Sequence, residues 1–339
     1  MNPINSGIKS ITFFRIFAAK LNHMQDLLPI HFAPVQGYTE AVYRNAHATY
    51  FGGVDTYYTP FVRLEKGNFR NKDVREIGAS INTVPHLVPQ LIAPTPEKAE
   101  TILALFIEKG YQEADINLGC PFPILAKRHN GSGILPYPEE VKALLSIVTK
   151  YPQISFSIKM RLGWEDPSEC LQLVDMINEL PLRQVTMHPR LGKQQYKGEV
   201  DMEGFAAFQQ ACQHPLIYNG DICSVEDIRR IQERFPELAG IMIGRGLLTK
   251  PELALEYTES RTLTVKEKID RIRNMHNQIF SSYKEQIEGG EMQLLNKMKT
   301  IWEYLLPEAD KKYKKAIHKS NHIDKYMQAV SILLNNTLL

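Results

Sequence analysis

The 339-residue sequence has nearly balanced charge, with 40 lysines and arginines against 38 aspartates and glutamates, and 43% of its residues are hydrophobic. This composition allows one large buried core with a smaller satellite domain, and it excludes a basic surface over the whole molecule, so that a polyanion would have to bind a local patch. The four cysteines, Cys120, Cys170, Cys212 and Cys223, lack metal-ligand spacing, so we expect free thiols, a reducing compartment and no metal site.

The first segment of the chain contains a short apolar stretch over residues 9–22. Arg15 and Lys20 interrupt this stretch, and neither a small-residue cleavage site nor a long membrane span follows it. We therefore treat residues 1–30 as an N-terminal extension without an assigned role. We expect a cytoplasmic protein that does not enter a membrane.

Short apolar runs alternate with amphipathic stretches between residues 31 and 255. The eight runs are residues 31–35, 54–59, 86–92, 113–117, 154–160, 184–188, 215–218 and 240–243. Thr95 and Pro96 mark the start of one helix that Gly110 ends, and Ser224 begins another. Eight strand–helix units predict an α/β fold, a parallel (β/α)8 TIM barrel. The first strand lacks the glycine-rich turn of an open doubly wound sheet, which favours the barrel.

The pattern changes after residue 255, where an all-α domain is predicted over residues 256–339. Thr264 and Glu267 form a capping-box pattern in front of apolar residues at helical spacing. A second apolar stripe near the C-terminus consists of Ile323, Tyr326, Met327, Val330, Leu333 and Leu334. Between these helices, residues 311–319 are rich in lysine. This basic run fits a solvated helix face and a phosphate-contacting patch equally well.

Polar residues gather where the predicted strands end, and in a barrel these positions line the site. They are Gln90, Asn117, Cys120, Lys159, Arg161, His188, Arg190, Asn219 and Asp221, followed by Gly244, Arg245 and Gly246. Burial without partners would cost on the order of 1–3 kcal/mol for each group, so we expect a polar ligand in the barrel mouth. The glycines near Arg245 expose backbone N–H groups and the arginine offers a fork, which predicts a phosphorylated cofactor.

Two of these residues, Lys159 and His188, allow more than one interpretation. Lys159 is either a Schiff-base former or a cation beside an electron-rich ring such as a flavin. His188 either satisfies a hydrogen bond in the core or contacts a ligand. Cys120 lies at the end of a strand between Gly119 and Pro121, and this is the placement expected of a reacting group.

Taken together, the motifs resemble the tRNA-dihydrouridine synthase family. The matching segments are residues 33–39, 90–91, 115–121, 127, 131–132, 159–164, 188, 190, 194, 196, 198, 201, 219–222 and 243–246. They lie between residues 31 and 255, and the set is specific although each piece alone is weak.

The resemblance implies an FMN enzyme that reduces the C5–C6 double bond of particular uridines in tRNA with electrons from NADPH, or from NADH. By matching position, the cofactor would be bound by Pro34, Val35, Gln36, Gln90, Lys159, His188, Asn219, Gly220, Asp221, Gly244 and Arg245. Asn117, Lys127 and Arg190 would contact the substrate. Cys120 would act as the general acid at C5, on the face opposite the hydride. Residues 256–339 would bind tRNA, and we expect a monomer without a protein partner.

The sequence also departs from the family pattern at four positions. Pro60, Ile124, Pro189 and Met202 stand where relatives commonly have a glutamate, a lysine, a glycine and an aromatic residue. Ile124 and Pro189 border the expected substrate mouth, so they bear on specificity more than on chemistry. Two alternatives therefore remain, an FMN-dependent barrel oxidoreductase that acts on a small molecule and a catalytically silent RNA-binding relative.

Overall fold

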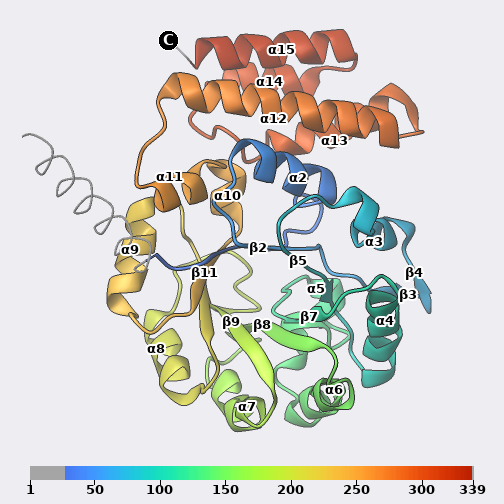
Figure 1. The fold of residues 1–339 in the computed structure, drawn as a ribbon, viewed down its shortest axis with the longest axis vertical. Coiled ribbons are helices and arrows are strands. Elements are labelled where there is room, and N and C mark those ends of the chain that lie inside the picture. The colour runs from blue at the N-terminus through green and yellow to red at the C-terminus, as the bar shows by residue number, and fades with distance from the viewer. Residues whose placement is uncertain (1–26, 338–339) are drawn as a thin grey trace, which may run out of the picture.

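The computed structural model describes residues 27–337 (Figure 1). The first 26 residues of the predicted N-terminal extension therefore lie outside the described residues. Strand β1 begins at Ile30, which agrees with the predicted start of the barrel. Within the described range, no helix is long and apolar enough to cross a membrane.

Nine parallel strands form the central sheet. They are β1 (Ile30–Phe32), β2 (Thr56–Tyr58), β5 (Leu87–Val88), β6 (Gln90–Leu91), β7 (Glu113–Leu118), β8 (Ser155–Gly163), β9 (Leu182–Leu191), β10 (Leu216–Asn219) and β11 (Gly240–Ile243). Their order is β5-β2-β1-β11-β10-β9-β8-β7-β6, so that the two ends of the sheet are consecutive pieces of chain. Because only Pro89 separates β5 from β6, the ring closes there, which confirms the predicted eight-unit barrel.

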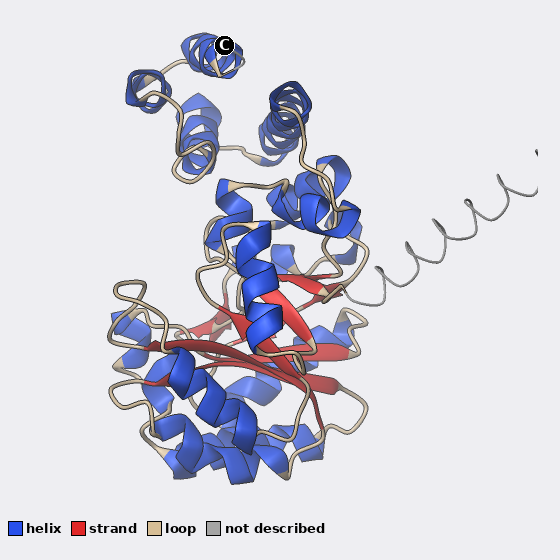
Figure 2. Cartoon of the chain, turned by 90° about the vertical axis from the view of Figure 1, so that its left-hand side faces the viewer, coloured by secondary structure: helices blue, strands red, loops and turns tan. Residues whose placement is uncertain are grey.

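Helices surround the sheet on its outer side (Figure 2). They are α2 (Ala41–Tyr50), α3 (Asn71–Glu76), α4 (Pro96–Glu108), α6 (Pro138–Lys150), α7 (Glu169–Asn178), α8 (Met202–Ala211), α9 (Val225–Arg234), α10 (Arg245–Thr249) and α11 (Leu253–Glu259). Short elements in the loops are β3 (Leu64–Glu65), β4 (Asn68–Phe69), α5 (Pro123–Ala126), η1 (Ala79–Ile81) and η2 (Gly131–Ile134). The segment after Cys120 thus contains α5 and η2.

The predicted helix ends are mostly confirmed. The Ser224 side chain accepts the N–H of Asp227 at 3.1 Å at the start of α9. Thr95 occupies the N-cap position of α4, but its side chain accepts no capping hydrogen bond from the helix, so the expected cap is only positional. Gly110 follows α4 with φ of +85°, a left-handed conformation that favours glycine and ends the helix.

Four further helices, α12 (Val265–Gln286), α13 (Gly290–Ile301), α14 (Lys311–Lys319) and α15 (Ile323–Asn336), lie beyond α2 and α11 at one end of the molecule (Figures 1 and 2). The capping box of Thr264 and Glu267 is present at the start of α12. Tyr326, Val330, Leu333 and Leu334 of the predicted stripe are buried on α15, together with Ala329, which confirms the small helical bundle.

A buried polar network joins three of these helical segments. The Tyr326 hydroxyl accepts the indole N–H of Trp302 at 2.9 Å and lies 2.9 Å from Nε2 of His276. Burial lowers the pKa of His276 to about 4, so its imidazole is neutral near pH 7. His276 Nδ1 lies 3.3 Å from Asn277 Oδ1, which only accepts, so Nδ1 carries the proton and Nε2 accepts the Tyr326 hydroxyl. Each polar group of the network is thereby satisfied without water.

The segment between β1 and α2 contacts the helical bundle at Tyr38 and at Glu40. Glu40, at the N-cap of α2, accepts the Tyr283 hydroxyl at 3.1 Å and the Lys297 ammonium at 2.6 Å. Tyr38, in the loop after β1, donates to Glu303 and packs edge-on against Tyr304 with ring centroids 4.9 Å apart. The segment between β1 and α2 therefore carries both the barrel mouth and the docking point of the bundle.

Tyr326→Phe should lower the free energy of unfolding by about 1–3 kcal/mol, because it leaves the buried Trp302 N–H and the His276 nitrogen without a partner. Tyr313→Phe on α14 is the control, since it removes a hydroxyl outside this network. Urea unfolding of both variants measures the difference. Equal stability of the two variants would contradict the importance of the network.

Candidate active site

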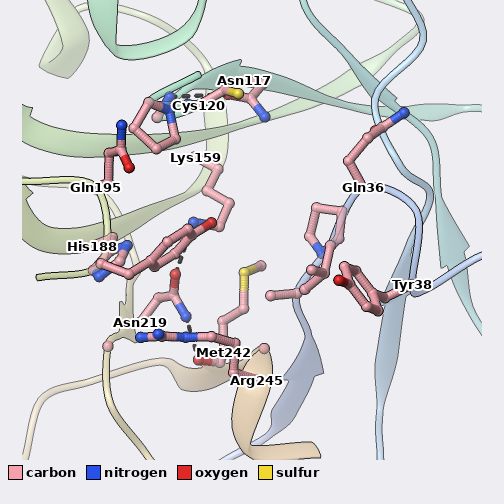
Figure 3. Close-up of a pocket in the computed structure, with 18 of the residues that line it drawn as sticks. Gln36, Tyr38, Asn117, Cys120, Lys159, His188, Gln195, Asn219, Met242 and Arg245 are labelled. Carbon is pink, nitrogen blue, oxygen red and sulfur yellow. Dashed lines mark hydrogen bonds between the residues drawn. The ribbon is translucent and has the colours of Figure 1, made fainter. Parts of the chain in front are cut away.

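A cavity of about 890 Å³ opens where the barrel strands end (Figure 3). Twelve of the predicted site residues line it, namely Pro34, Val35, Gln36, Asn117, Cys120, Lys159, His188, Asn219, Gly220, Asp221, Gly244 and Arg245. Its volume is typical of a cofactor or substrate pocket. The strand-end positions are thus brought together as the barrel prediction required.

Three predicted site residues do not line this cavity. Gln90 is fully buried, with its amide bonded to Asp115 and Asn117, because its side chain lies one layer deeper in the barrel. Arg190 is also buried, and it pairs with Asp221. Lys127 is exposed at the end of α5. The predicted direct contacts of Gln90 and Arg190 with a ligand in the cavity therefore disagree with their placement.

Cys120 is held at the end of β7 by its backbone. Asn117 Oδ1 accepts the N–H groups of Gly119 at 3.0 Å and of Cys120 at 2.8 Å. The Cys120 carbonyl accepts the Ser132 N–H and hydroxyl, each at 3.0 Å. A Cβ on Gly131 would lie 2.6 Å from the Cys120 carbonyl oxygen, and φ there is +60°, so only glycine fits. This explains the Gly-Ser pair that follows the cysteine.

The Cys120 thiol lies partly buried on the cavity wall. Burial raises the pKa of Cys120 above its ordinary value, although the Phe122 N–H and the charges of Arg161 and Lys159 act in the opposite direction. The thiol is therefore protonated near pH 7. It can donate a proton, and it is a weak nucleophile in this state.

Lys159 extends from β8 into the cavity next to Asn117 in the register. Its ammonium donates to Asn219 Oδ1 at 2.8 Å, and Asn219 Nδ2 donates to the Met242 carbonyl at 2.8 Å, which links three strands (Figure 3). Burial, and then the charge of Arg161, lower the pKa of Lys159 to about 8. Among residues 27–337, no carboxylate lies within ion-pair distance of this cation, so an anionic ligand would stabilise it.

His188, on β9, is buried among cations. Burial, followed by the charges of Arg161 and Lys159, holds the pKa of His188 well below its ordinary value, so the ring is neutral. Arg190 Nη1 lies 3.3 Å from His188 Nε2. Because a guanidinium only donates, Nε2 is the acceptor and Nδ1 carries the proton. His188 therefore interacts with the site as a neutral polar ring.

Asp221 is directed toward two arginines. It accepts from both terminal nitrogens of Arg190, with the Nη1 contact at 2.9 Å, and from Arg245 Nη2 at 3.1 Å. Burial opposes its ionisation, but the hydrogen bond and charge of Arg190 and the charge of Arg245 hold the pKa of Asp221 below its ordinary value. This carboxylate therefore orients Arg245 at the cavity wall and is itself already paired.

Tyr196 lies over the cationic side of the cavity. The guanidinium carbons of Arg245 and Arg161 lie 4.5 Å and 5.5 Å from its ring centroid. Tyr304 reaches the same cavity from the segment after α13. Neither tyrosine was assigned a site role from the sequence. Tyr196 is part of the family-like motif and could have been found, whereas nothing near Tyr304 marks it as a site residue.

Residues 31–337 match the family described as dihydrouridine synthase. The chain belongs to the dihydrouridine synthase family.

Two relatives of this dihydrouridine synthase family member illustrate the match. A tRNA-dihydrouridine synthase B from Pasteurella multocida is 30% identical over 231 residues, 66% of this chain and 67% of that protein. A tRNA-dihydrouridine(16) synthase from Pseudomonas syringae pv. tomato is 30% identical over 242 residues, 69% of this chain and 76% of that protein. A solved structure of the old yellow enzyme from Trypanosoma cruzi is 13% identical with a TM-score of 0.46, covering 69% of this chain and 89% of that chain.

The buried Lys159 ammonium predicts a pH-dependent stability. The pKa of Lys159 is about 8 in the folded protein and 10.5 ordinarily, so between these values the unfolded chain binds more protons and the parent protein gains stability as pH rises. Lys159→Met lacks this gain. Between pH 7 and pH 10.5, the free energy of unfolding of the parent should therefore rise by roughly 3 kcal/mol relative to that of the variant.

Urea unfolding of the ligand-free proteins at several pH values measures this shift. The matched control is Lys142→Met, which removes an exposed lysine of α6 and should show a constant difference from the parent. A constant difference for Lys159→Met as well would contradict a buried cation at this position.

Proposed function

We propose that this protein is a tRNA-dihydrouridine synthase that reduces the C5–C6 bond of specific uridines in tRNA. It uses FMN reduced by NADPH, and Cys120 is the proton donor. The observation that supports this function most strongly is the combination of a protonated thiol with Lys159, Asn219 and Arg245 around one cavity. The family match and the named relatives support the substrate class.

The cavity residues fit FMN in chemistry and size. The walls combine apolar side chains, among them Val35 and Met242, with buried cations that lack sufficient carboxylate partners. Gly244 at the N-cap of α10 and Arg245 both line the cavity, and the first N–H groups of a helix have no partner within the helix itself, which suits a phosphate. In this assignment Lys159, His188 and Asn219 contact the ring and ribityl portion, and Gly220, Gly244 and Arg245 contact the phosphate.

FMN supplies a hydride to C6 of the uracil when it is bound. The protein supplies the second hydrogen, because Cys120 holds a proton on its sulfur and donates it to C5. The raised pKa of Cys120 keeps the thiol in this form at neutral pH. Asn117 fixes the backbone of Cys120, and it lies on the cavity wall, where its remaining N–H can contact the base.

The target base must leave its stack to enter the cavity, which costs a few kcal/mol and is least costly in a loop. Phe122 and Ile124 are exposed beside the thiol, at 53% and 58% of their full surface, and they offer an apolar rim to such a nucleotide. The cations of α14 would contact tRNA phosphates farther away, and Lys127 would contribute at the end of α5. We assign tRNA binding to residues 256–339 and expect a cytoplasmic monomer.

A small-molecule substrate is the alternative, since the chemistry of the cavity alone would also reduce an activated double bond. The exposed lysines of α14 favour RNA, because a small substrate has no use for them. If the flavin-reduced protein is mixed with bulk tRNA or with free uridine, rapid flavin oxidation by tRNA alone supports the proposal. Rapid oxidation by free uridine alone would contradict it.

Cys120→Ala should lower the rate of dihydrouridine formation by about 10²–10⁴-fold, because it removes the acid while leaving the cofactor contacts intact. Flavin content should stay at the parental level. Nucleoside mass spectrometry of tRNA treated with each protein measures the product. Cys212→Ala, outside the cavity, is the control, and a Cys120→Ala variant as fast as the parent would overturn the assignment.

Replacing Lys312 and Lys315 of α14 together by Gln should weaken tRNA binding and reduce its salt dependence. Each lost phosphate contact lowers the slope of log affinity against log salt by about 0.7–0.9. The turnover number at saturating tRNA should not change. The matched control replaces two exposed lysines on α4 and α6, Lys98 and Lys142. If both pairs change the salt slope equally, α14 is not the binding surface.

A further inference from the structure

A chain of buried hydrogen bonds runs from the barrel interior to the backbone of Cys120. Asp115 Oδ2 accepts from Gln90 Nε2 at 2.7 Å, and Gln90 Oε1 accepts from Asn117 Nδ2 at 2.7 Å. Asn117 Oδ1 then accepts the N–H of Cys120 at 2.8 Å. The side chains of Asp115 and Gln90 are fully buried, and neither lines the cavity.

The strand register explains this chain of contacts. Gln90 of β6, Asp115 of β7 and Ser157 of β8 are neighbours in the parallel ladder. Asn117 follows Asp115 by two residues, so both side chains point to the same side of β7, with Asn117 nearer the strand end. The contact between Gln90 and Asn117 therefore connects an inner layer of the barrel to the layer that lines the cavity.

The orientations of the Gln90 and Asn117 side-chain amides are fixed independently from the two ends of this row of hydrogen bonds. A carboxylate oxygen needs a donor, so Asp115 requires the NH2 group of Gln90 on its side. Two backbone N–H groups need an acceptor, so Gly119 and Cys120 require the oxygen of Asn117. Both requirements leave the Gln90 oxygen facing the Asn117 NH2 group. If the Gln90 amide flipped, its NH2 group would face the NH2 group of Asn117, and its oxygen would face the Asp115 carboxylate.

The protonation state of Asp115 does not change this direction. Burial raises the pKa of Asp115 above its ordinary value, whereas the hydrogen bonds from Ser157 and Gln90 lower it. A proton on Asp115 would reside on Oδ1, where the Ser157 hydroxyl at 2.6 Å can accept as well as donate. Oδ2 accepts from Gln90 in either state. The row of hydrogen bonds thus requires a hydrogen-bond acceptor at position 115 and does not require a negative charge there.

We propose that Asp115 is a positioning residue for the Cys120 thiol, acting through the amides of Gln90 and Asn117. Asp115 touches neither the substrate nor the cofactor in this assignment. It sets the orientation of Asn117, and Asn117 sets the backbone that carries the proton donor. The activity part of the test rests on the proposed function, whereas the thiol part does not.

Two substitutions of Asp115 distinguish the effect of its hydrogen-bond acceptor from the effect of its charge. Asn at position 115 can accept from Gln90 with its oxygen and donate to Ser157 with its NH2 group, so Asp115→Asn should keep the turnover number within about twofold of the parent. Asp115→Leu removes the acceptor and lets Gln90 rotate, so the turnover number should fall by about tenfold or more. The KM for tRNA should change less than the turnover number in both variants, since the phosphate contacts assigned to α14 lie far from Asp115.

The thiol itself provides a measurement that needs neither cofactor nor tRNA. Iodoacetamide alkylation of Cys120, followed by peptide mass spectrometry with the exposed Cys223 as internal reference, reports how firmly the segment is held. In Asp115→Leu the relative alkylation rate of Cys120 should rise by about threefold or more, because the loosened backbone opens more often. Asp115→Asn should match the parent.

Ser157→Ala is the matched control, because it removes the other hydrogen bond to Asp115 and leaves the Gln90 contact in place. Its turnover number and Cys120 alkylation should equal those of the parent within about twofold. If Asp115→Leu does not fold, Gln90→Met interrupts the same chain with a side chain of similar length and should show the same two changes.

The inference is wrong if Asp115→Leu, or Gln90→Met in its place, keeps the parental alkylation rate of Cys120. It is also wrong if Asp115→Asn is impaired as strongly as Asp115→Leu, since charge would then matter and not the acceptor. A parent protein that forms no dihydrouridine in tRNA would overturn the proposed function alone. The alkylation result would still decide the role of Asp115.

Discussion

The hydrogen bonds from the backbone of Gly119 and Cys120 to the Asn117 side chain are the contacts on which the active site depends. They fix the thiol beside the cavity at the end of β7, and Asn117 itself pairs with Lys159 of the neighbouring strand. The absent side chain of Gly131 allows the following segment to close over the cysteine carbonyl. The proposed function requires the proton donor at a fixed position, and the barrel register holds the Cys120 thiol in place at the cavity wall.

Burial has opposite effects on the two kinds of ionisable group in the cavity. It raises the pKa of the Cys120 thiol and so retains its proton, whereas it lowers the pKa of Lys159 to about 8 and that of Arg161 to about 10. Asp221 offsets only the charges of Arg190 and Arg245. Lys159 and Arg161 donate to neutral oxygens and so make the cavity favourable for an anionic cofactor, and the same desolvation would keep the thiol protonated for the transfer that we propose.

The sequence was sufficient for the barrel and for most of the cavity wall, because apolar runs and polar strand ends follow directly from a parallel sheet with a ligand at its carboxyl edge. The sequence did not predict which hydrogen-bond partner a buried polar side chain takes, because tertiary contacts decide between equivalent partners. Gln90 is at a predicted strand end, yet its amide turns to Asp115. Arg190 similarly turns to Asp221. Tyr304 enters the cavity from a distant helical segment, which no local pattern could indicate.

The proposed arrangement of thiol and cofactor on opposite faces of the base is tested most directly by the stereochemistry of the product. Reduction of tRNA uridine in deuterated water should place one deuterium at C5 and one at C6, because the thiol and the N5–H of the reduced flavin both exchange with solvent before transfer. NMR of the isolated dihydrouridine should show the two new hydrogens on opposite faces of the ring. Both hydrogens on the same face, or no solvent deuterium at C5, would contradict Cys120 as the proton donor.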